Sequence, residues 1–223
     1  MAWFVSNSIP TENQKKNNAF ELLNFVQSRN GSPACAAALC ANAEKESYLN
    51  PGVWQNLTVG TGGYGLFQWD PSSKLTNWCA EQNIPSANGD SQMRCLYEHT
   101  VALGQWFNIN LSATHKSDWL ASWYMPWSNF LASDATPSYL AGVFVCSFER
   151  PGAILYGDRA SQEKEITARG ELADKWYQIL TGEKPPLPPE YGWEFLPVNI
   201  KRGVYSQANH RKKRRRRYVF IYR

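Results

Sequence analysis

The chain has 223 residues, of which 43% are hydrophobic and 19% charged, as in folded globular proteins. No run of 18 apolar residues occurs, which excludes a predicted transmembrane helix. The formal net charge of +4 is local, because the run RKKRRRR at 211–217 contributes seven positive charges and the remainder carries −3. With five cysteines, three histidines and no Cys-x-x-Cys pair, we expect no metal site, no cofactor and mostly buried free thiols, although one disulfide is compatible with the count.

Two helices are predicted before residue 50. The first covers about 11–28, with its apolar residues on one face, and Gly31 ends it. Ser32 is a predicted N-cap with Pro33 at the first helical position. The second helix, PACAAALCANAEKES at 33–47, therefore stops at the following Asn-Pro-Gly.

A glycine-rich segment, LTVGTGGYGLFQW at 57–69, predicts a short β-hairpin or tight loop. Asp70 and Pro71 then have the pattern of a helix start, with Asp70 as its N-cap. Further helical patterns cover 91–108, 118–123, 138–148 and 161–180. The sequence thus predicts a mainly α fold with a small β-hairpin.

The C-terminal region differs in composition. EKPPLPPE begins at residue 183 and predicts a semi-rigid linker over 183–192. It separates a domain at 1–182 from a basic arm at 193–223, which is too short to fold alone.

Two glutamates, Glu44 and Glu46, lie in the last turn of the second predicted helix. On a helical wheel the apolar stripe is centred near Leu39, with Glu46 inside it and Glu44 on its flank. We expect Glu44 and Lys45 to form a solvated face. Apolar surroundings and the negative end of the helix dipole would both raise the pKa of Glu46, as a general acid requires.

The order of three motifs resembles the phage tail lysozyme family. ESYLNPGVWQNL at 46–57 is followed directly by GTGGYGLFQW at 60–69, and the similarity continues through LTNWCAEQN, GQWFN, FVCSFERPG and DKWYQIL. It covers about 17–180. The Glu-Ser and Gly-Leu-x-Gln pieces are also similar to goose-type lysozymes and lytic transglycosylases, which share a lysozyme-like fold.

The resemblance implies a function. It makes Glu46 the catalytic acid, and it makes Gln68 a contact for the N-acetyl or hydroxyl groups of the sugar. The expected activity is that of a virion-associated muramidase, a glycoside hydrolase that cuts the β-1,4 bond between N-acetylmuramic acid and N-acetylglucosamine in peptidoglycan. A lytic transglycosylase acting on the same bond, or a non-catalytic glycan-binding tail-tip protein, are the alternatives.

Glycoside hydrolysis usually needs a second carboxylate, and two candidates are present. Asp70 is close to the glycine-rich loop, but its context favours the N-cap, and the family commonly has threonine there. Glu149 precedes Arg150, which favours a buried ion pair between the two, with a substrate contact by Glu149 as the alternative. Without a second carboxylate, the N-acetyl or 6-hydroxyl group of the substrate would complete the displacement.

Several aromatic residues are candidates for the wall of a glycan groove. Tyr64, between two loop glycines, is the first choice. Trp69 and Trp54 fit either the groove or the core. Trp119, Trp123 and Trp127 are spaced by four residues, but Pro126 interrupts the stripe, so core and groove wall remain open for them.

The basic arm suggests partners besides peptidoglycan. Its charge would suit anionic wall polymers, lipid headgroups or nucleic acid. Its terminal YVFIYR could instead add a strand to another phage tail protein, and a free solvated tail is a further alternative. The first residues lack a basic segment followed by a long apolar run, so we expect synthesis in the host cytoplasm without a Sec signal. The resemblance to phage tail lysozymes implies a final location at the phage tail tip.

Overall fold

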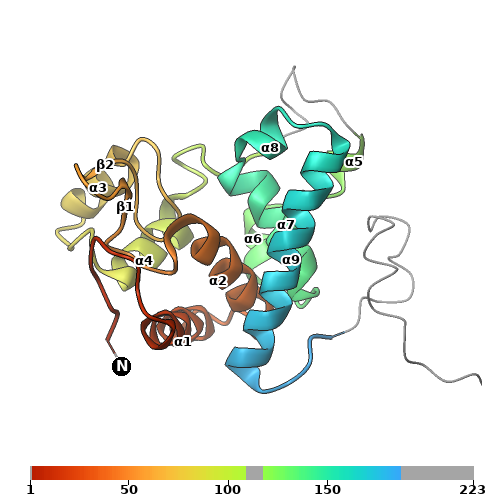
Figure 1. Cartoon of the computed structure of the whole chain (residues 1–223), viewed down its shortest axis with the longest axis horizontal. Coiled ribbons are helices and arrows are strands. Elements are labelled where there is room, and N and C mark those ends of the chain that lie inside the picture. Colours follow the sequence, from red (N-terminus) through yellow and green to blue (C-terminus); the bar gives the residue numbers. More distant parts are fainter. Residues whose placement is uncertain (1, 109–117, 187–223) are drawn as a thin grey trace, which may run out of the picture.

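The computed structural model describes residues 2–108 and 118–186. It is mainly helical, with one two-stranded antiparallel sheet, as the sequence predicts (Figure 1). The elements are, in chain order, α1 (Glu12–Ser28), α2 (Pro33–Ser47), β1 (Trp54–Asn56), β2 (Thr61–Tyr64), α3 (Ser73–Glu81), α4 (Gly89–His99), α5 (Asp118–Ala121), α6 (Trp127–Leu131), α7 (Pro137–Phe144), the π-helix η2 (Val145–Glu149), α8 (Gly152–Leu155) and α9 (Arg159–Thr181).

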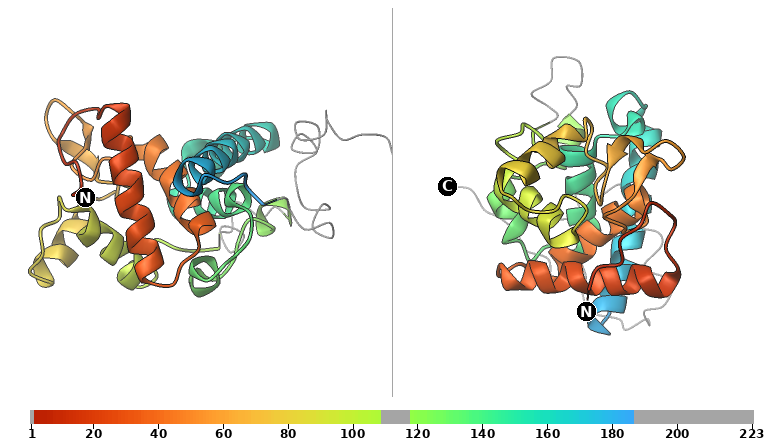
Figure 2. Two further views of the ribbon diagram at one scale, coloured as in Figure 1. Left: turned by 90° about the horizontal axis from the view of Figure 1, so that it is seen from below. Right: turned by 90° about the vertical axis from the view of Figure 1, so that its left-hand side faces the viewer.

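Helix α2 lies at the centre of the molecule and packs against α1, α7 and α9. The hairpin, α3 and α4 lie to one side of it, and α5 to α9 lie to the other (Figures 1 and 2). Its alanines and cysteines are fully buried or nearly so. Small side chains let three helices approach one backbone closely, which explains why this helix is the axis of the core.

The predicted helix starts are confirmed at both N-terminal helices. The side chain of Thr11 accepts a hydrogen bond from the Gln14 N–H while the Gln14 side chain accepts one from the Thr11 N–H, a capping box. The Ser32 hydroxyl accepts a hydrogen bond from the Cys35 N–H at the start of α2.

One predicted helix ends earlier than expected, and another changes its type along its length. The pattern at 91–108 becomes α4, which ends at His99 because the chain then turns, with Gly104 at a φ of +64°. The pattern at 138–148 divides into α7 and the π-helix η2. A π-helix inserts an extra residue per turn and cannot be distinguished from an α-helix by apolar periodicity over five residues.

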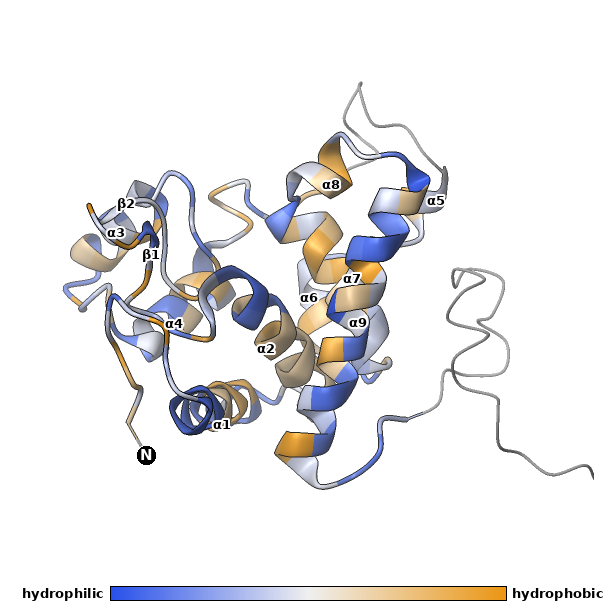
Figure 3. Cartoon of the chain, in the orientation of Figure 1, coloured by the Kyte–Doolittle hydropathy of each residue, from blue (hydrophilic) through white to orange (hydrophobic). Residues whose placement is uncertain are grey.

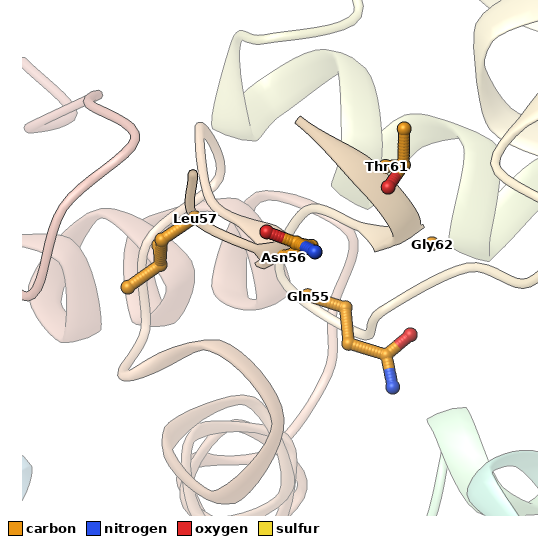
Figure 4. A pocket seen from close by; sticks show the side chains of 5 residues that line it. All are labelled: Gln55, Asn56, Leu57, Thr61 and Gly62. Atoms are coloured by element: carbon orange, nitrogen blue, oxygen red, sulfur yellow. The ribbon is translucent and has the colours of Figure 1, made fainter. Parts of the chain in front are cut away.

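The predicted hairpin is present but begins earlier in the chain. Trp54 pairs with Tyr64 and Asn56 with Thr61, and an irregularity separates the two pairs. Tyr64 also forms an isolated bridge with Trp69, which folds the Gly-Leu-Phe-Gln loop back on the hairpin. Figure 4 shows the hairpin from close by.

The tryptophans at 119, 123 and 127 belong to the core rather than to a groove. Trp123 and Trp127 are buried in two different apolar clusters, and Trp119 packs against the cluster of Trp123. Pro126 is the N-cap residue of α6, so the three residues do not share one helix.

All five cysteines are buried free thiols, as expected. Burial raises the pKa of the Cys35 thiol to about 12, so it stays protonated and unreactive at neutral pH. None of the helices in the described ranges is long and apolar enough to cross a membrane. The basic arm and most of the proline-rich linker lie outside the described residues.

Residues 2–8 run along the surface toward the hairpin. Asn50 receives a hydrogen bond from the Ser6 N–H and donates to the carbonyls of Ser6 and Ser8. Asn7 donates to the Leu57 carbonyl and accepts from the Trp54 N–H. We call this segment the N-terminal strap, since it ties the hairpin to the end of α2.

Candidate active site

A cleft of about 650 Å³ opens at the C-terminal end of α2. This volume is within the range of ~300–1,000 Å³ usual for small-molecule sites. The end of α2 that meets it is hydrophilic, in contrast to the buried body of the helix (Figure 3). The cleft is lined by Glu46, Tyr48, Val53, Trp54, Gln55, Leu57, Gly63, Gln68, Asp70, Glu149, Pro151 and Gly152.

The backbone after α2 is held in an unusual conformation. Tyr48 and Leu49 both have positive φ, +56° and +59°, in the left-handed region that non-glycine residues rarely adopt. The Ser47 hydroxyl donates to the Ala43 carbonyl and also lies within hydrogen-bond distance of the Leu66 carbonyl, at 2.9 Å in each case. Ser47 therefore connects the end of α2 to the Gly-Leu-Phe-Gln loop, which gives the Glu-Ser motif a structural reason.

Glu46 faces the packed side of α2, as the wheel predicts, with 22% of its side chain exposed. Its surroundings differ from the expected apolar ones, because Glu46 Oε1 accepts a hydrogen bond of 2.5 Å from Nη2 of Arg169. Glu46 thus combines access to the cleft with a fixed ionic partner behind it.

Arg169 comes from α9, and its side chain is only 3% exposed. Besides Glu46, it donates to Oδ1 of Asn42 at 2.9 Å and to Oε1 of Glu165 at 2.8 Å. A buried guanidinium with three acceptors fixes the position of each of them, because its donors lie in one rigid plane.

Sequence reasoning missed Arg169 although a signal existed. Ile166, Arg169 and Ala173 follow one another at helical spacing, and all three are buried. A charge inside an apolar stripe is the same signal that singled out Glu46.

Glu44 does not form the expected solvated face, although Lys45 is exposed as predicted. Oε1 of Glu44 pairs with Lys15 of α1 at 3.2 Å, and Oε2 accepts 2.7 Å from the indole N–H of Trp176 in α9. Its partners come from elements distant in sequence, which a wheel of one helix cannot include. Glu44 joins three helices and does not line the cleft.

Glu149 does not form the expected ion pair with Arg150. The Arg150 guanidinium donates to the carbonyls of Gln105 and Ser147 and lies 4.8 Å from the ring centre of Phe107. Glu149 instead lines the cleft, and its buried Oε1 has no hydrogen-bond partner among the described residues. Burial raises the pKa of Glu149 well above the usual value for glutamate; Glu46 adds to the rise, while Arg169 and Arg150 oppose it.

Asp70 is not the N-cap of α3, because that helix starts at Ser73 with Ser72 before it. Its side chain is exposed and lines the cleft. The structure therefore places three carboxylates, Glu46, Glu149 and Asp70, around one cleft.

Gln68 lines the cleft as well, with a φ of +42°. Its amide N–H groups contact the carbonyls of Val53 and Gly65 at 3.2 and 3.0 Å. Its Oε1 is recessed and has no partner among the described residues, so this oxygen is available to accept a hydrogen bond from a ligand.

The first choice for the groove wall, Tyr64, is corrected, and Trp69, which by sequence fits either groove or core, belongs to the core. Trp69 is fully buried and Tyr64 is 6% exposed, so neither forms the surface of the cleft. Trp54 does so instead, and its ring lies 4.3 Å from that of Tyr64, measured between centroids. Tyr64 and Trp69 support the cleft wall from behind.

Gln92 of α4 is a second residue that sequence reasoning missed. It is fully buried, accepts from the Leu66 N–H at 2.8 Å and donates to the carbonyls of Pro51 and Ser86 at 2.7 Å each. One side chain thus holds both the glycine-rich loop and the Asn-Pro-Gly turn.

A second hollow, of about 540 Å³, lies along the hairpin and is lined by Gln55, Asn56, Leu57, Thr61 and Gly62 (Figure 4). It shares Gln55 and Leu57 with the main cleft. In the described parts of the chain, no group of three or more His, Cys, Asp or Glu side chains is placed to hold a metal ion.

Comparison with known proteins agrees with this architecture. The chain is 29% identical, over 168 residues, to morphogenesis protein 1 of Bacillus phage B103. The aligned part covers 74% of this chain and 40% of that relative, so the chain spans less than half of the relative's length. The sequence model of the phage tail lysozyme family matches residues 17–180, which hold the cleft and all of its carboxylates, and the chain belongs to this family.

Proposed function

We propose that this protein is a muramidase of the phage tail tip, which cuts the β-1,4 bond between N-acetylmuramic acid and N-acetylglucosamine to open the host wall for genome delivery. The observation that carries the proposal is Glu46, a carboxylate held by a buried arginine at the edge of a cleft of ligand size. Family membership and the phage relative support a role in the virion.

In this proposal Glu46 is the general acid that protonates the glycosidic oxygen. Trp54 offers its ring to one face of a sugar, and Gln68 offers its acceptor to an N-acetyl N–H or a hydroxyl group. The three carboxylates around the cleft favour hydrolysis over transglycosylation, since a carboxylate besides Glu46 is available to assist an incoming water.

The test uses purified peptidoglycan with the wild-type protein and the Glu46→Gln variant. We expect soluble muropeptides from the wild type, with reducing ends and without 1,6-anhydro ends in mass spectrometry, and none from the variant at a temperature where it is still folded. Products with 1,6-anhydro ends would establish a transglycosylase. Binding of the glycan by the wild type without any release of fragments would establish a structural tail protein.

A further inference from the structure

Glu149 occupies an unusual position for a structural glutamate. It is the last residue of η2, and a π-helical turn in a helix of this kind is frequently found at functional sites. Arg150, which follows it, has a φ of +47° and is fixed by the two carbonyls to which it donates. Glu149 therefore lies between a π-helical turn and a residue of positive φ whose side chain is bound to the backbone.

One carboxyl oxygen of Glu149 lacks a hydrogen bond within the described ranges. This oxygen, Oε1, is buried, although the residue lines the cleft. Arg150 already donates its hydrogen bonds to backbone carbonyls. Arg169 already donates to Glu46, Glu165 and Asn42. With this oxygen unpaired, an ionised carboxylate would cost more free energy than a neutral carboxyl group does.

The charges around the cleft also favour the neutral form of Glu149. Glu149 lines the cleft together with Glu46 and Asp70, and the negative charge of Glu46 acts on it, as do the positive charges of Arg169 on α9 and Arg150 at the end of η2. The hydrogen bonds of Arg169 to Glu46 and Glu165 already match its single positive charge with two carboxylates. An ionised Glu149 would add a further negative charge beside Glu46, and two such groups in one site cannot both ionise readily.

We propose that Glu149 is the proton-holding partner of Glu46, and that the two carboxyl groups share one proton beside Arg169. In the resting protein this proton is on Glu149. It passes to Glu46 through cleft water, and from Glu46 to the glycosidic oxygen as the bond from that oxygen to C1 of N-acetylmuramic acid breaks. The attacking water adds its oxygen to C1 and returns one proton to the pair, which therefore begins and ends each turnover with one proton.

This inference rests on the proposed glycosidase activity and explains how an acid paired with arginine obtains its proton. It is tested by the dependence of kcat/KM on pH for the wild type, Glu149→Gln and Glu44→Gln. Glutamine has the shape of a neutral carboxyl group, so Glu149→Gln keeps the packing and removes only the proton. Glu44→Gln is the matched control, because Glu44 belongs to the same turn of α2 as Glu46 but lies outside the cleft.

We expect the basic limb of the Glu149→Gln profile to move to lower pH, with a loss of about 10²-fold at neutral pH that is largely recovered in acid. The Glu44→Gln profile should match that of the wild type. A Glu149→Gln profile identical to the wild type, or lowered equally at every pH, would overturn the inference.

A second measurement does not depend on activity. The infrared spectrum of Glu149→Gln is subtracted from that of the wild type, both at neutral pH. The difference should contain the C=O band of a protonated carboxylic acid, which the wild type has and the variant lacks. No difference in this band would overturn the inference even if the protein cuts peptidoglycan. The band together with a wild type that cuts no glycan would instead overturn the proposed function.

Discussion

Glu44 and Glu46 lie two residues apart in the last turn of α2, yet they contact different parts of the molecule. Glu44 is held by Lys15 and Trp176, between helices, whereas Glu46 is held by Arg169 and faces the cleft. A rotation of about 200° around the helix separates their side chains, so that one lies between helices and the other reaches the cleft.

Substitution of Glu44 should therefore lower stability and leave glycan cleavage in place. Glu44→Ala leaves the Trp176 N–H and the Lys15 ammonium without this acceptor, and we expect a loss of about 1–3 kcal/mol in the free energy of unfolding. Glycan cleavage at a temperature below the transition should remain. Thermal unfolding and fragment release measure the two effects separately, and loss of cleavage in folded Glu44→Ala would contradict the division.

Arg169→Lys tests whether geometry or charge matters at the ionic partner. Lysine keeps the positive charge but lacks the planar donors that contact Glu46, Glu165 and Asn42 together. We expect the variant to fold and to lose at least about tenfold in kcat, since misplacement of a reacting group by even ~1 Å is costly. Wild-type kcat in this variant would show that charge alone is sufficient.

At the scale of elements, the Gly-Leu-Phe-Gln loop is positioned by its neighbours rather than by its own propensity. Gln92 of α4 and Ser47 of α2 each bond the backbone of Leu66. Gly65 is required there for two reasons: its φ is +80°, and a Cβ at this position would lie 2.4 Å from Oε1 of Gln92.

Gly65→Ala should therefore displace Gln92 and the loop, with losses of both stability and glycan cleavage. Gly104→Ala is the matched control, because Gly104 also has positive φ, +64°, but nothing lies within 4 Å of the added Cβ. The control should cost only the backbone strain, about 1–2 kcal/mol, and retain activity. Equal effects of the two substitutions on activity would contradict the role of Gln92.

The sequence predicts the elements and the inward direction of Glu46 more fully than it predicts the contacts around that residue. Apolar periodicity and capping residues are local, so α1, α2 and the inward direction of Glu46 could be predicted. The partners of Glu44 lie 29 and 132 residues away, and that of Glu46 lies 123 residues away. Such contacts are set by the packing of α1 and α9 on α2, which no local pattern contains.

The sequence favours Tyr64 over Trp54 as the residue that lines the cleft, and the structure shows the reverse for a similar reason. The two residues are cross-strand partners, so their side chains lie on the same face of the hairpin and stack. Which of them is outermost depends on how the hairpin is seated on the rest of the fold, and alternation along one strand does not reveal it.

For the whole molecule, a partly buried acid at the interface of α7 and α9, Asp174, affects stability. Burial is the largest cause that raises the pKa of Asp174 from 3.8 to about 6, and its hydrogen bonds to Ser138 oppose the rise. Because the folded-state pKa is above the unfolded one, the contribution to stability is complete below pH 3.8 and is lost as the pH rises through 6.

Asp174→Asn should flatten this dependence. Chemical denaturation between pH 4 and pH 7 should show a falling free energy of unfolding for the wild type and a smaller slope for the variant. Some slope should remain in the variant, because Glu149 acts with the same sign. An identical slope in both proteins would contradict this assignment.

The N-terminal strap has a practical consequence for anyone who shortens the protein. The family match begins at residue 17, whereas Asn7, which bonds both Trp54 and Leu57, lies before it. A chain cut to the family boundary would keep Glu46 and Arg169 but release the outer wall of the cleft. If the proposed function holds, the shortened chain should bind glycan more weakly than the full chain, because Trp54 and Leu57 would have lost their contacts with Asn7.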